Sequence, residues 1–263
     1  MPTLGLTFVV AVNDRSILKR NLLASPCLQD TTVEVLELEG YASAASAYNA
    51  AIKQAANDLI VFVHQDVFLP ADWISQLLSG IDSLENSGAP WGVIGCCGKT
   101  QDGIRLGHLY TPGEGVIGAA FAKPERVRVL DEVVLVVRKC SGLRFGEDLP
   151  GFHFYGTHIC LSAAEMGLSC YAISAFCIHN SRQYFDYPPE FYTCYRHIKR
   201  RWSNCLPIHT PCICVSRFDW DIWKRRIKRF AFGLSSERGA RIEDPRILMR
   251  EIQAQAHLGQ LRP

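Results

Sequence analysis

The sequence predicts an α/β protein in which a mostly parallel sheet is flanked by helices. Short apolar segments rich in β-branched residues, such as residues 59–63 and 133–137, have the composition of strands buried on both faces. They alternate with segments such as residues 42–57, whose apolar residues recur at helical spacing. A chain of 263 residues with 48% hydrophobic residues is also long and apolar enough to form a large core, which excludes disorder as the main state.

The first half of the chain is expected to alternate strands and helices at short intervals. We expect strands at residues 6–12, 32–38 and 59–63, and helices at residues 16–23, 42–57 and 71–78. Ser16 is expected to cap the first of these helices, because a serine side chain accepts a hydrogen bond from a free amide of the first turn. In the second helix, Tyr48 and Ile52 lie four residues apart on the apolar face. Pro70 precedes the third helix and fixes a first-turn backbone angle.

The next part of the chain is expected to complete the sheet. We expect strands at residues 91–97 and 168–178, one or two more within residues 126–138, and a helix at residues 158–166 that ends at Gly167. Residues 98–118 are rich in glycine and polar residues and are expected to form a loop region. Residues 142–156 combine glycine, proline, acidic and aromatic residues, which is typical of an irregular loop at an active site.

The composition changes near residue 185. Two basic clusters, residues 196–201 and 224–229, lie beyond this point, so we expect a domain at residues 1–185 and a basic, mainly helical extension at residues 186–263. The net charge of only +2 excludes a strong overall field for nucleic acid, and no nucleic-acid partner is expected. Eleven cysteines without regular spacing indicate reduced, mostly buried residues of a cytoplasmic protein, and no targeting or membrane-spanning segment is recognisable.

Polar side chains follow several of the expected strands. Ligands of open α/β sheets bind outside the carboxyl ends of the strands, where these side chains gather. They are Asn13, Asp14, Glu39, His64, Asp66 and His179. Any one of them is equally compatible with an ordinary polar loop, but their joint placement favours a site. Residues two apart on an extended backbone point the same way, so His64 and Asp66 could share a cation.

Two motifs carry a resemblance to a known family. The sequences His64-Gln65-Asp66 and Phe154-Tyr155-Gly156-Thr157-His158 resemble motifs of the family 2 type of nucleotide-sugar glycosyltransferases, which have the GT-A fold, and in particular of a bacterial subgroup with a His-Gln-Asp metal motif. The resemblance covers residues 4–185. It implies a glycosyltransferase that moves a sugar from a nucleotide-diphosphate donor to an acceptor with the help of Mn²⁺ or Mg²⁺. A saccharide, a lipid-linked molecule and a small molecule all remain open as the acceptor.

The resemblance also implies roles for individual residues on the donor side. His64, Asp66 and His179 would hold the metal, and with a single carboxylate we expect weak metal binding until the nucleotide arrives. Tyr48 stands where the family often has an arginine, so one positive contact is missing. The residues implied in donor binding are Asn13, Asp14, Glu39, Asn49, Gln65 and Asp66.

The residue expected to act as general base departs from the family pattern, because the family has an aspartate where this chain has His158. An inverting transfer needs a base that takes the proton of the acceptor hydroxyl. Three interpretations remain open at this point. His158 itself is the base, as a neutral imidazole at a helix start. Alternatively, Glu147 or Asp148 in the preceding loop is the base. In the third interpretation, His158 marks a weakened or inactive relative that binds a nucleotide sugar or a protein partner.

The acceptor side is expected to involve a carboxylate and aromatic rings. Asp131, beside Glu132, lies where the family lines its acceptor pocket, although exposed charges before a strand would give the same pattern. Phe152 and Tyr155 could stack on a sugar ring, although most aromatic side chains pack in cores.

The C-terminal region permits two further interpretations. Cys205, His209, Cys212 and Cys214 lie within ten residues and permit a zinc site, but a Cys-x-Cys pattern with apolar neighbours is also that of a buried strand. The basic clusters alternate with tryptophans and could contact an anionic membrane at its inner face, a surface that suits a lipid-linked acceptor; a solvated helix face is the alternative. A nucleotidyltransferase would need a Gly-rich loop after the first strand, which residues 13–19 do not provide.

Overall fold

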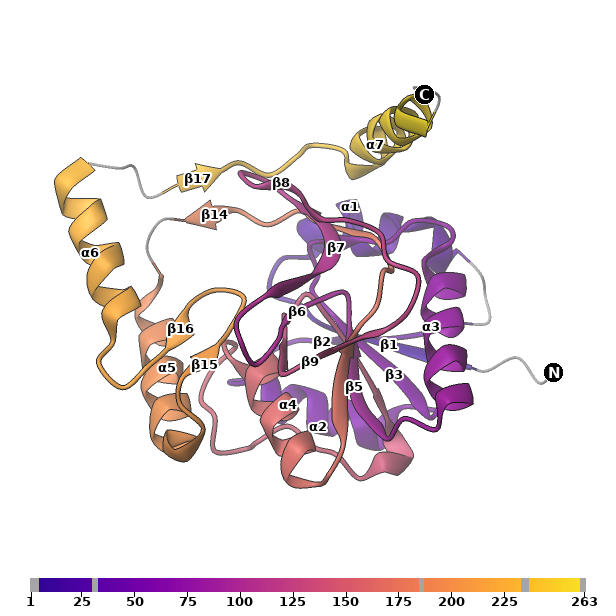
Figure 1. The fold of residues 1–263 in the computed structure, drawn as a ribbon. Helices are drawn as coiled ribbons and strands as arrows, with labels where there is room; N and C mark the ends of the chain where they lie inside the picture. Colours follow the sequence, from indigo (N-terminus) through magenta and orange to yellow (C-terminus); the bar gives the residue numbers. More distant parts are fainter. Residues whose placement is uncertain (1–4, 30–32, 185–186, 233–236, 261–263) are drawn as a thin grey trace.

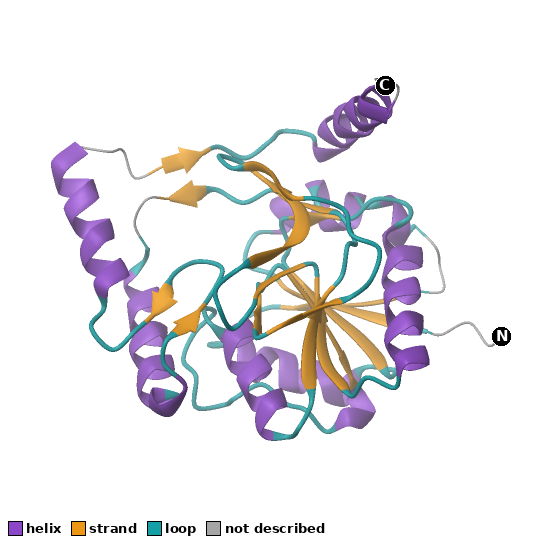
Figure 2. Ribbon diagram, in the orientation of Figure 1, coloured by secondary structure: helices purple, strands orange, loops and turns teal. Residues whose placement is uncertain are grey.

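The computed structural model describes residues 5–29, 33–184, 187–232 and 237–260, and a seven-stranded sheet lies at its centre (Figures 1 and 2). The strands of this sheet are β1 (Leu6–Ala11), β2 (Glu34–Leu38), β3 (Leu59–Val63), β5 (Trp91–Gly95), β9 (Glu125–Val127), β11 (Val134–Arg138) and β12 (Ser169–Ala172). Their order is β2-β1-β3-β11-β5-β12-β9. Three neighbouring pairs are parallel and three are antiparallel. The predicted α/β class is confirmed, with a sheet more mixed than the mostly parallel one expected.

Helices cover both faces of this sheet. They are α1 (Arg15–Arg20), α2 (Ala44–Gln54), α3 (Trp73–Ser87) and α4 (Tyr155–Glu165). Side chains of β11 alternate between the faces: Leu135 and Val137 join the core under α2 and α4, whereas Val134 and Val136 join the core under α1 and α3. Because both of their faces are buried, the inner strands β3, β5 and β11 are almost entirely apolar, which made them recognisable in the sequence.

Two helix starts differ from the sequence expectation. Asp14, not Ser16, caps α1, and its carboxylate accepts hydrogen bonds from the backbone amides of Ser16 at 2.8 Å and Ile17 at 3.2 Å. Either residue type is a good cap, and here the aspartate stands one position before the first helical residue. Helix α4 begins at Tyr155, three residues earlier than expected, after Phe154 in a left-handed conformation with φ of 65°.

A second sheet replaces part of the expected loop region. It contains β4 (Val67–Phe68), β6 (Cys97–Lys99), β7 (Arg105–Thr111), β8 (Gly115–Gly118), β10 (Val129–Leu130) and β13 (Cys177–His179). The loop expected at residues 98–118 is therefore wrong, because β7 alternates buried and more exposed residues with the period of a strand. The glycines of this segment serve close strand pairing: a Cβ at Gly118, where φ is 71°, would lie 2.0 Å from the carbonyl oxygen of Gly107.

The strand expected at residues 168–178 is divided between the two sheets. Its first part is β12 in the central sheet, and its last part is β13, which pairs with β7 and β4 in the second sheet. The chain therefore leaves one sheet and enters the other before it reaches His179, which is the last residue of β13.

Residues after 186 add helices and short strands. These elements are α5 (Pro189–Arg201), β15 (Ile208–His209), β16 (Cys214–Val215), α6 (Trp220–Phe232), β17 (Glu237–Gly239) and α7 (Pro245–Gln260), with β17 paired to β14 (Gln183–Tyr184). Short 3-10 helices occur at Leu22–Ala24, Pro26–Leu28, Lys139–Ser141 and Ser203–Cys205. Figure 1 shows α5 beside the sheet domain, whereas α6 and α7 lie at its margins.

Helix α5 belongs to the main core. Its buried residues Cys194, Tyr195 and Ile198 pack in the same cluster as residues of α2 and α4, as does Trp202 after its end. Residues 185–186, where we expected the domain boundary, lie outside the described residues, and the division into two domains stays a prediction. Among the described residues, no helix is both long and apolar enough to cross a bilayer.

Candidate functional site

A cavity of about 530 Å³ opens at the carboxyl ends of β1, β2 and β3, and we call it the donor cavity. Its walls come from the residues that directly follow these strands, from the loop before α4 and from the segment after β17. The lining residues are Ala11, Val12, Asn13, Leu38, Gly40, Tyr41, Tyr48, His64, Gln65, Asp66, Phe152, Tyr155 and Arg241. The location is the one at which open α/β sheets bind ligands.

Two histidines and an aspartate meet at this cavity, and we call them the first histidine cluster. His179 Nε2 lies 3.6 Å from Asp66 Oδ1 and 3.4 Å from His64 Nδ1, and His64 Nδ1 lies 4.0 Å from the same carboxylate oxygen. The three ligand atoms are all within 4.8 Å of one another. One carboxylate and two imidazoles in this arrangement fit a divalent cation such as Mn²⁺.

The His64 ring is held in the orientation that a metal ligand needs. The hydroxyl of Tyr155 donates to the backbone oxygen of Glu132 at 3.1 Å and lies 2.7 Å from His64 Nε2. In the tautomer with its proton on Nε2, His64 donates to this hydroxyl, and the lone pair of Nδ1 is available to a cation beside Asp66 and His179. Tyr155 therefore orients a ligand of the first histidine cluster as well as lining the cavity.

Electrostatics favour the protonation states that bind a cation. Burial, together with the nearby His179, lowers the pKa of His64 to about 4, so its imidazole is neutral at pH 7. Burial by itself raises the pKa of Asp66, but the imidazoles of His179 and His64 and the guanidinium of Arg241 bring it below the usual value. A neutral imidazole beside an ionised carboxylate is the ligand form for a divalent metal.

Arg241 is a site residue that sequence reasoning missed. Its guanidinium lies 3.5 Å from Asp66 Oδ2, although it comes from the far end of the chain. The buried Asn180, next to His179, fixes this segment: its amide oxygen accepts from the backbone amide of Ile242 at 2.7 Å, and its backbone oxygen accepts from Arg241 Nε at 3.2 Å. In the sequence, Arg241 is one arginine among others in a basic region, so nothing marked it as a site residue.

The loop after β1 is hydrogen-bonded to the His64-Gln65-Asp66 motif. The side-chain oxygen of Gln65 accepts hydrogen bonds from the backbone amides of Asn13 and Asp14, both at 3.1 Å. Asn13 lines the donor cavity, whereas the Asp14 carboxylate caps α1. Glu39 lies between two lining residues and pairs with Arg15 at 2.6 Å. The residues expected to bind a nucleoside thus lie at or beside one cavity.

Comparison with protein families identifies the chain. A model described as "Glycosyltransferase like family" matches residues 7–196, which is more than half of the protein.

The chain belongs to this glycosyltransferase-like family. The family-level resemblance drawn from the His64-Gln65-Asp66 and Phe154–His158 motifs is thereby confirmed, and the narrower subgroup with a His-Gln-Asp motif stays a prediction.

The known proteins that are similar to this chain have low sequence identity to it. The product of ATP synthase subunits region ORF 6 of Fuscovulum blasticum is 31% identical over 134 residues, 48% of this chain and 53% of that protein, so the match spans about half of the relative. TarS of S. aureus (residues 1–349, with UDP-GlcNAc) has a TM-score of 0.46 at 13% identity over 87% of this chain and 73% of TarS. The mannosyltransferase PcManGT of Pyrobaculum calidifontis, in complex with GDP-Man and Mn²⁺, has a TM-score of 0.45 at 12% identity. The match covers 98% of this chain and 81% of PcManGT.

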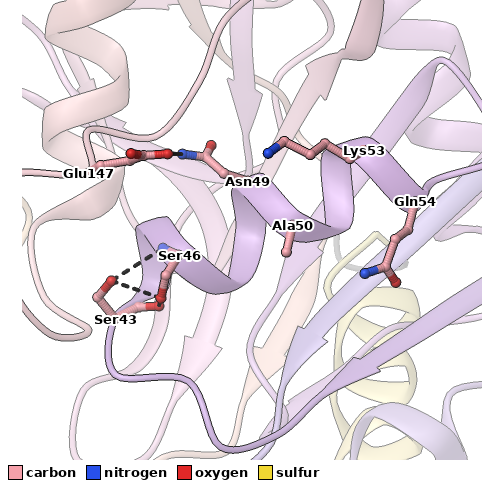
Figure 3. Close-up of a pocket in the computed structure, with 7 residues that line it drawn as sticks. All are labelled: Ser43, Ser46, Asn49, Ala50, Lys53, Gln54 and Glu147. Carbon is pink, nitrogen blue, oxygen red and sulfur yellow. Dashed lines mark hydrogen bonds between the residues drawn. The ribbon is translucent and has the colours of Figure 1, made fainter.

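The structure gives Asn49 of this glycosyltransferase-like protein contacts away from the donor cavity. Its side-chain amide forms two hydrogen bonds with the backbone of Phe145. Nδ2 donates to the carbonyl oxygen at 2.9 Å, and Oδ1 accepts from the backbone amide at 3.0 Å. Figure 3 shows Asn49 pointing toward Glu147 beside α2, where the two side chains are 3.4 Å apart. Asn49 thus fixes the start of the loop that leads to Phe152, and a contact between Asn49 and the nucleotide stays a prediction.

His158 also lies apart from the donor cavity. Its side chain is only 4% exposed, and its Nε2 lies 3.4 Å from Asp148 Oδ1. His197 of α5 lies 3.2 Å from the other oxygen of the same carboxylate. These residues form a second histidine cluster, in which the three ligand atoms are within 4.8 Å of one another. The described contacts of His158 do not include any residue of the first histidine cluster, and its role as a base stays a prediction.

The expected acceptor residues occupy two adjoining places. Phe152 and Tyr155 line the donor cavity, whereas Asp131 lines a smaller pocket of about 40 Å³ together with Glu132. The Glu132 carboxylate accepts a hydrogen bond from the backbone amide of Gly156 at 3.2 Å. Burial, helped by the nearby Asp131, raises the pKa of Glu132 to about 8.

The cysteine segment near the C-terminus does not form the zinc site that its spacing permitted. Cys214 stands in β16 opposite His209 of β15, and the adjacent Val215 is buried. Among the described residues, only the two histidine clusters bring three ligand atoms within 4.8 Å, and neither contains a cysteine. The apolar neighbours of Cys214 therefore reflect a short buried strand pair.

Proposed function

We propose that this chain is a glycosyltransferase that binds a nucleotide-diphosphate sugar through a divalent cation on the first histidine cluster. The observation that carries the proposal is the convergence of His64, Asp66 and His179 at the donor cavity of a glycosyltransferase-like protein. In this reaction a bound cation supplies positive charge to the diphosphate leaving group as the glycosidic bond breaks.

The chain's own residues would position the donor. Asp66 and the two imidazoles would hold the cation, and Arg241, beside Asp66, would contact the diphosphate with a permanent positive charge. Asn13, Asp14 and Glu39 would contact the nucleoside, since they lie at or next to the wall of the donor cavity. Phe152 and Tyr155, which also line the cavity, would pack against the sugar or the acceptor.

The acceptor requires a base, and the contacts favour Glu132 over the residues nominated by the sequence. The His158 ring faces Asp148 and His197, and Glu147 contacts Asn49 beside α2. Glu132 instead lies one residue from Asp131, in the pocket that adjoins the donor cavity across Tyr155. A pKa of about 8 is close to the working pH, where a general base is most effective.

Helix α6 supports the proposed contact with an anionic membrane. Trp220, Trp223 and Ile227 are 60–62% exposed, and their spacing places them along one side of the helix. Lys224 is exposed on the same helix. A helix with exposed tryptophans and basic residues suits a surface of anionic lipid, where a lipid-linked acceptor would be presented. The basic side chains at positions 226, 228 and 229 lie outside the described side chains.

The donor half of the proposal is tested by binding. Calorimetry with UDP or GDP should give tighter binding in the presence of Mn²⁺, and Asp66→Asn should abolish the Mn²⁺ dependence. Asp102→Asn, an exposed aspartate between β6 and β7, is the matched control and should behave as the wild type. Equal Mn²⁺ dependence in all three proteins would refute the cation site.

The transfer half is tested by slow hydrolysis of a panel of UDP- and GDP-sugars, followed as nucleoside diphosphate release. Loss of turnover in Glu132→Gln with activity retained in His158→Gln supports Glu132 as the base. The reverse result would assign the base to His158. Donor binding without turnover of any sugar nucleotide would instead favour the alternative function, a nucleotide-sugar binding module.

A further inference from the structure

We propose that the second histidine cluster, Asp148, His158 and His197, is a binding site for a transition-metal ion of the Zn²⁺ type, separate from the donor cation. The proposal does not depend on the glycosyltransferase activity, because none of these residues lines the donor cavity.

The distance from each imidazole nitrogen to the Asp148 carboxylate is close to the spacing of neighbouring ligand atoms in a tetrahedral metal site. His158 Nε2 and His197 Nε2 lie 3.4 Å and 3.2 Å from the two oxygens of Asp148. Bonds of about 2.0–2.1 Å from a tetrahedral Zn²⁺ place neighbouring ligand atoms about 3.4 Å apart. All three ligand atoms lie within 4.8 Å of one another, so the side chains would draw together around a bound ion.

The two imidazole nitrogens lack any other partner. His158 Nε2 and His197 Nε2 are buried and make no hydrogen bond in the structure, although they lie 3.4 Å and 3.2 Å from oxygens of Asp148. A buried polar atom without a partner is costly, and native proteins rarely keep two of them side by side. A metal ion between these atoms and the carboxylate would satisfy all three at once.

An ordinary ion pair explains the cluster less well. Neither ring nitrogen makes a hydrogen bond with the carboxylate that it approaches. The two rings also stack at 6.2 Å with an interplanar angle of 23°, an arrangement that two positive charges would oppose.

The surroundings of His158 are those of a built site. Ser162, one turn further along α4, lies 3.3 Å from His158 Nδ1 and can fix the ring while Nε2 binds the metal. The indole ring of Trp202 packs edge-on at 5.5 Å. On the other side, a Cβ at Gly146 would lie 2.2 Å from the imidazole, so only a glycine lets the loop close over the ring.

Two imidazoles and one carboxylate are a common ligand set of zinc, and the half-exposed Asp148 leaves the fourth position open to water. The three ligands come from the loop before α4, from α4 itself and from α5. A bound ion would therefore tie α5 to the loop that continues to Phe152 at the donor cavity. This assigns a structural role to the histidine that stands where the family has an aspartate.

The test uses Co²⁺ as a spectroscopic probe, titrated into chelator-treated protein without nucleotide. We expect wild-type protein to bind one equivalent tightly, with the intense visible absorption of a tetrahedral site, because the first histidine cluster is expected to bind a metal only weakly without nucleotide. His197→Ala and Asp148→Asn should weaken this binding at least about 100-fold, more than loss of an outer-shell contact would. His209→Ala, a half-buried histidine outside both clusters, and His64→Ala, in the first histidine cluster, should titrate as the wild type.

The outcomes separate this site from the donor site. Competition by Zn²⁺, and a rise in Tm with Zn²⁺ in wild type but not in Asp148→Asn, would support the assignment. Absence of Co²⁺ binding in the wild type, unchanged titration of Asp148→Asn, or loss of the absorption in His64→Ala would overturn it. Asp148 is half exposed, so its asparagine variant keeps the test decisive if His197→Ala fails to fold.

Discussion

Replacing Glu132 by glutamine should change the pH dependence of stability in a way that follows from its position. The Glu132 carboxyl accepts a hydrogen bond from the Gly156 amide and lies beside Asp131 in the folded protein. Burial and the nearby Asp131 raise its pKa from 4.5 to about 8. The folded protein therefore keeps a proton on this group over a pH range in which the unfolded chain has released it.

The sign and size follow from linkage. Between pH 4.5 and 8 the folded state binds one more proton than the unfolded state, so this group destabilises the protein progressively as pH rises through that window. Between pH 5.5 and 8, the two pKa values give a loss of about 3 kcal/mol in the free energy of unfolding. Glutamine keeps an acceptor for the Gly156 amide and carries no titrating proton, so Glu132→Gln should escape this loss.

The assay is urea unfolding of both proteins at pH 5.5 and pH 8. The difference in unfolding free energy between Glu132→Gln and wild type should shift in favour of the variant by about 3 kcal/mol from the lower to the higher pH. Asp102→Asn, an exposed carboxylate, should show no such shift. A difference between Glu132→Gln and wild type that is the same at both pH values would refute a raised pKa for Glu132.

Three further predictions concern other parts of the molecule. Asn49→Ala should lower the free energy of unfolding by about 2 kcal/mol, because it leaves both backbone groups of Phe145 without their partner; an unchanged urea midpoint would contradict this. Arg241→Gln should weaken UDP or GDP binding about tenfold, as measured by calorimetry, with a smaller effect in high salt, and equal affinity would remove Arg241 from the donor site. Replacing Trp220 and Trp223 by serine should reduce sedimentation with vesicles of anionic lipid, and equal sedimentation would argue against membrane contact through α6.

The central sheet could be predicted from the sequence because its strands are buried on both faces. Residues 59–63 are apolar without interruption and form β3 over the same residues. The hairpin of β7 and β8 escaped prediction, because its glycines indicate a loop by composition but serve close strand pairing in the structure. Composition cannot separate these two uses of glycine, since the difference lies in whether another strand pairs closely beside the glycine.

The candidate site likewise has one part that the sequence predicted and one part that it did not. The local motif of His64 and Asp66 indicates a shared cation from spacing, and His179, which the resemblance implied, lies 3.6 Å from Asp66 in the structure. Arg241 reaches the same carboxylate only because Asn180 anchors the segment after β17. A contact of this kind depends on tertiary packing and leaves no pattern in the neighbouring sequence.

The departure at His158 has a different meaning once its neighbours are known. By sequence it is a missing carboxylate at the start of a helix, which suggests a weakened catalyst. In the structure the start of α4 still has a carboxyl group, because Glu132 accepts the hydrogen bond of the Gly156 amide from the connection between β10 and β11. His158 lies further along the first turn and faces His197 of α5, a helix that the sequence had placed in a separate extension. Replacement of the aspartate is thus compatible with a working acceptor side, provided that Glu132 supplies the base.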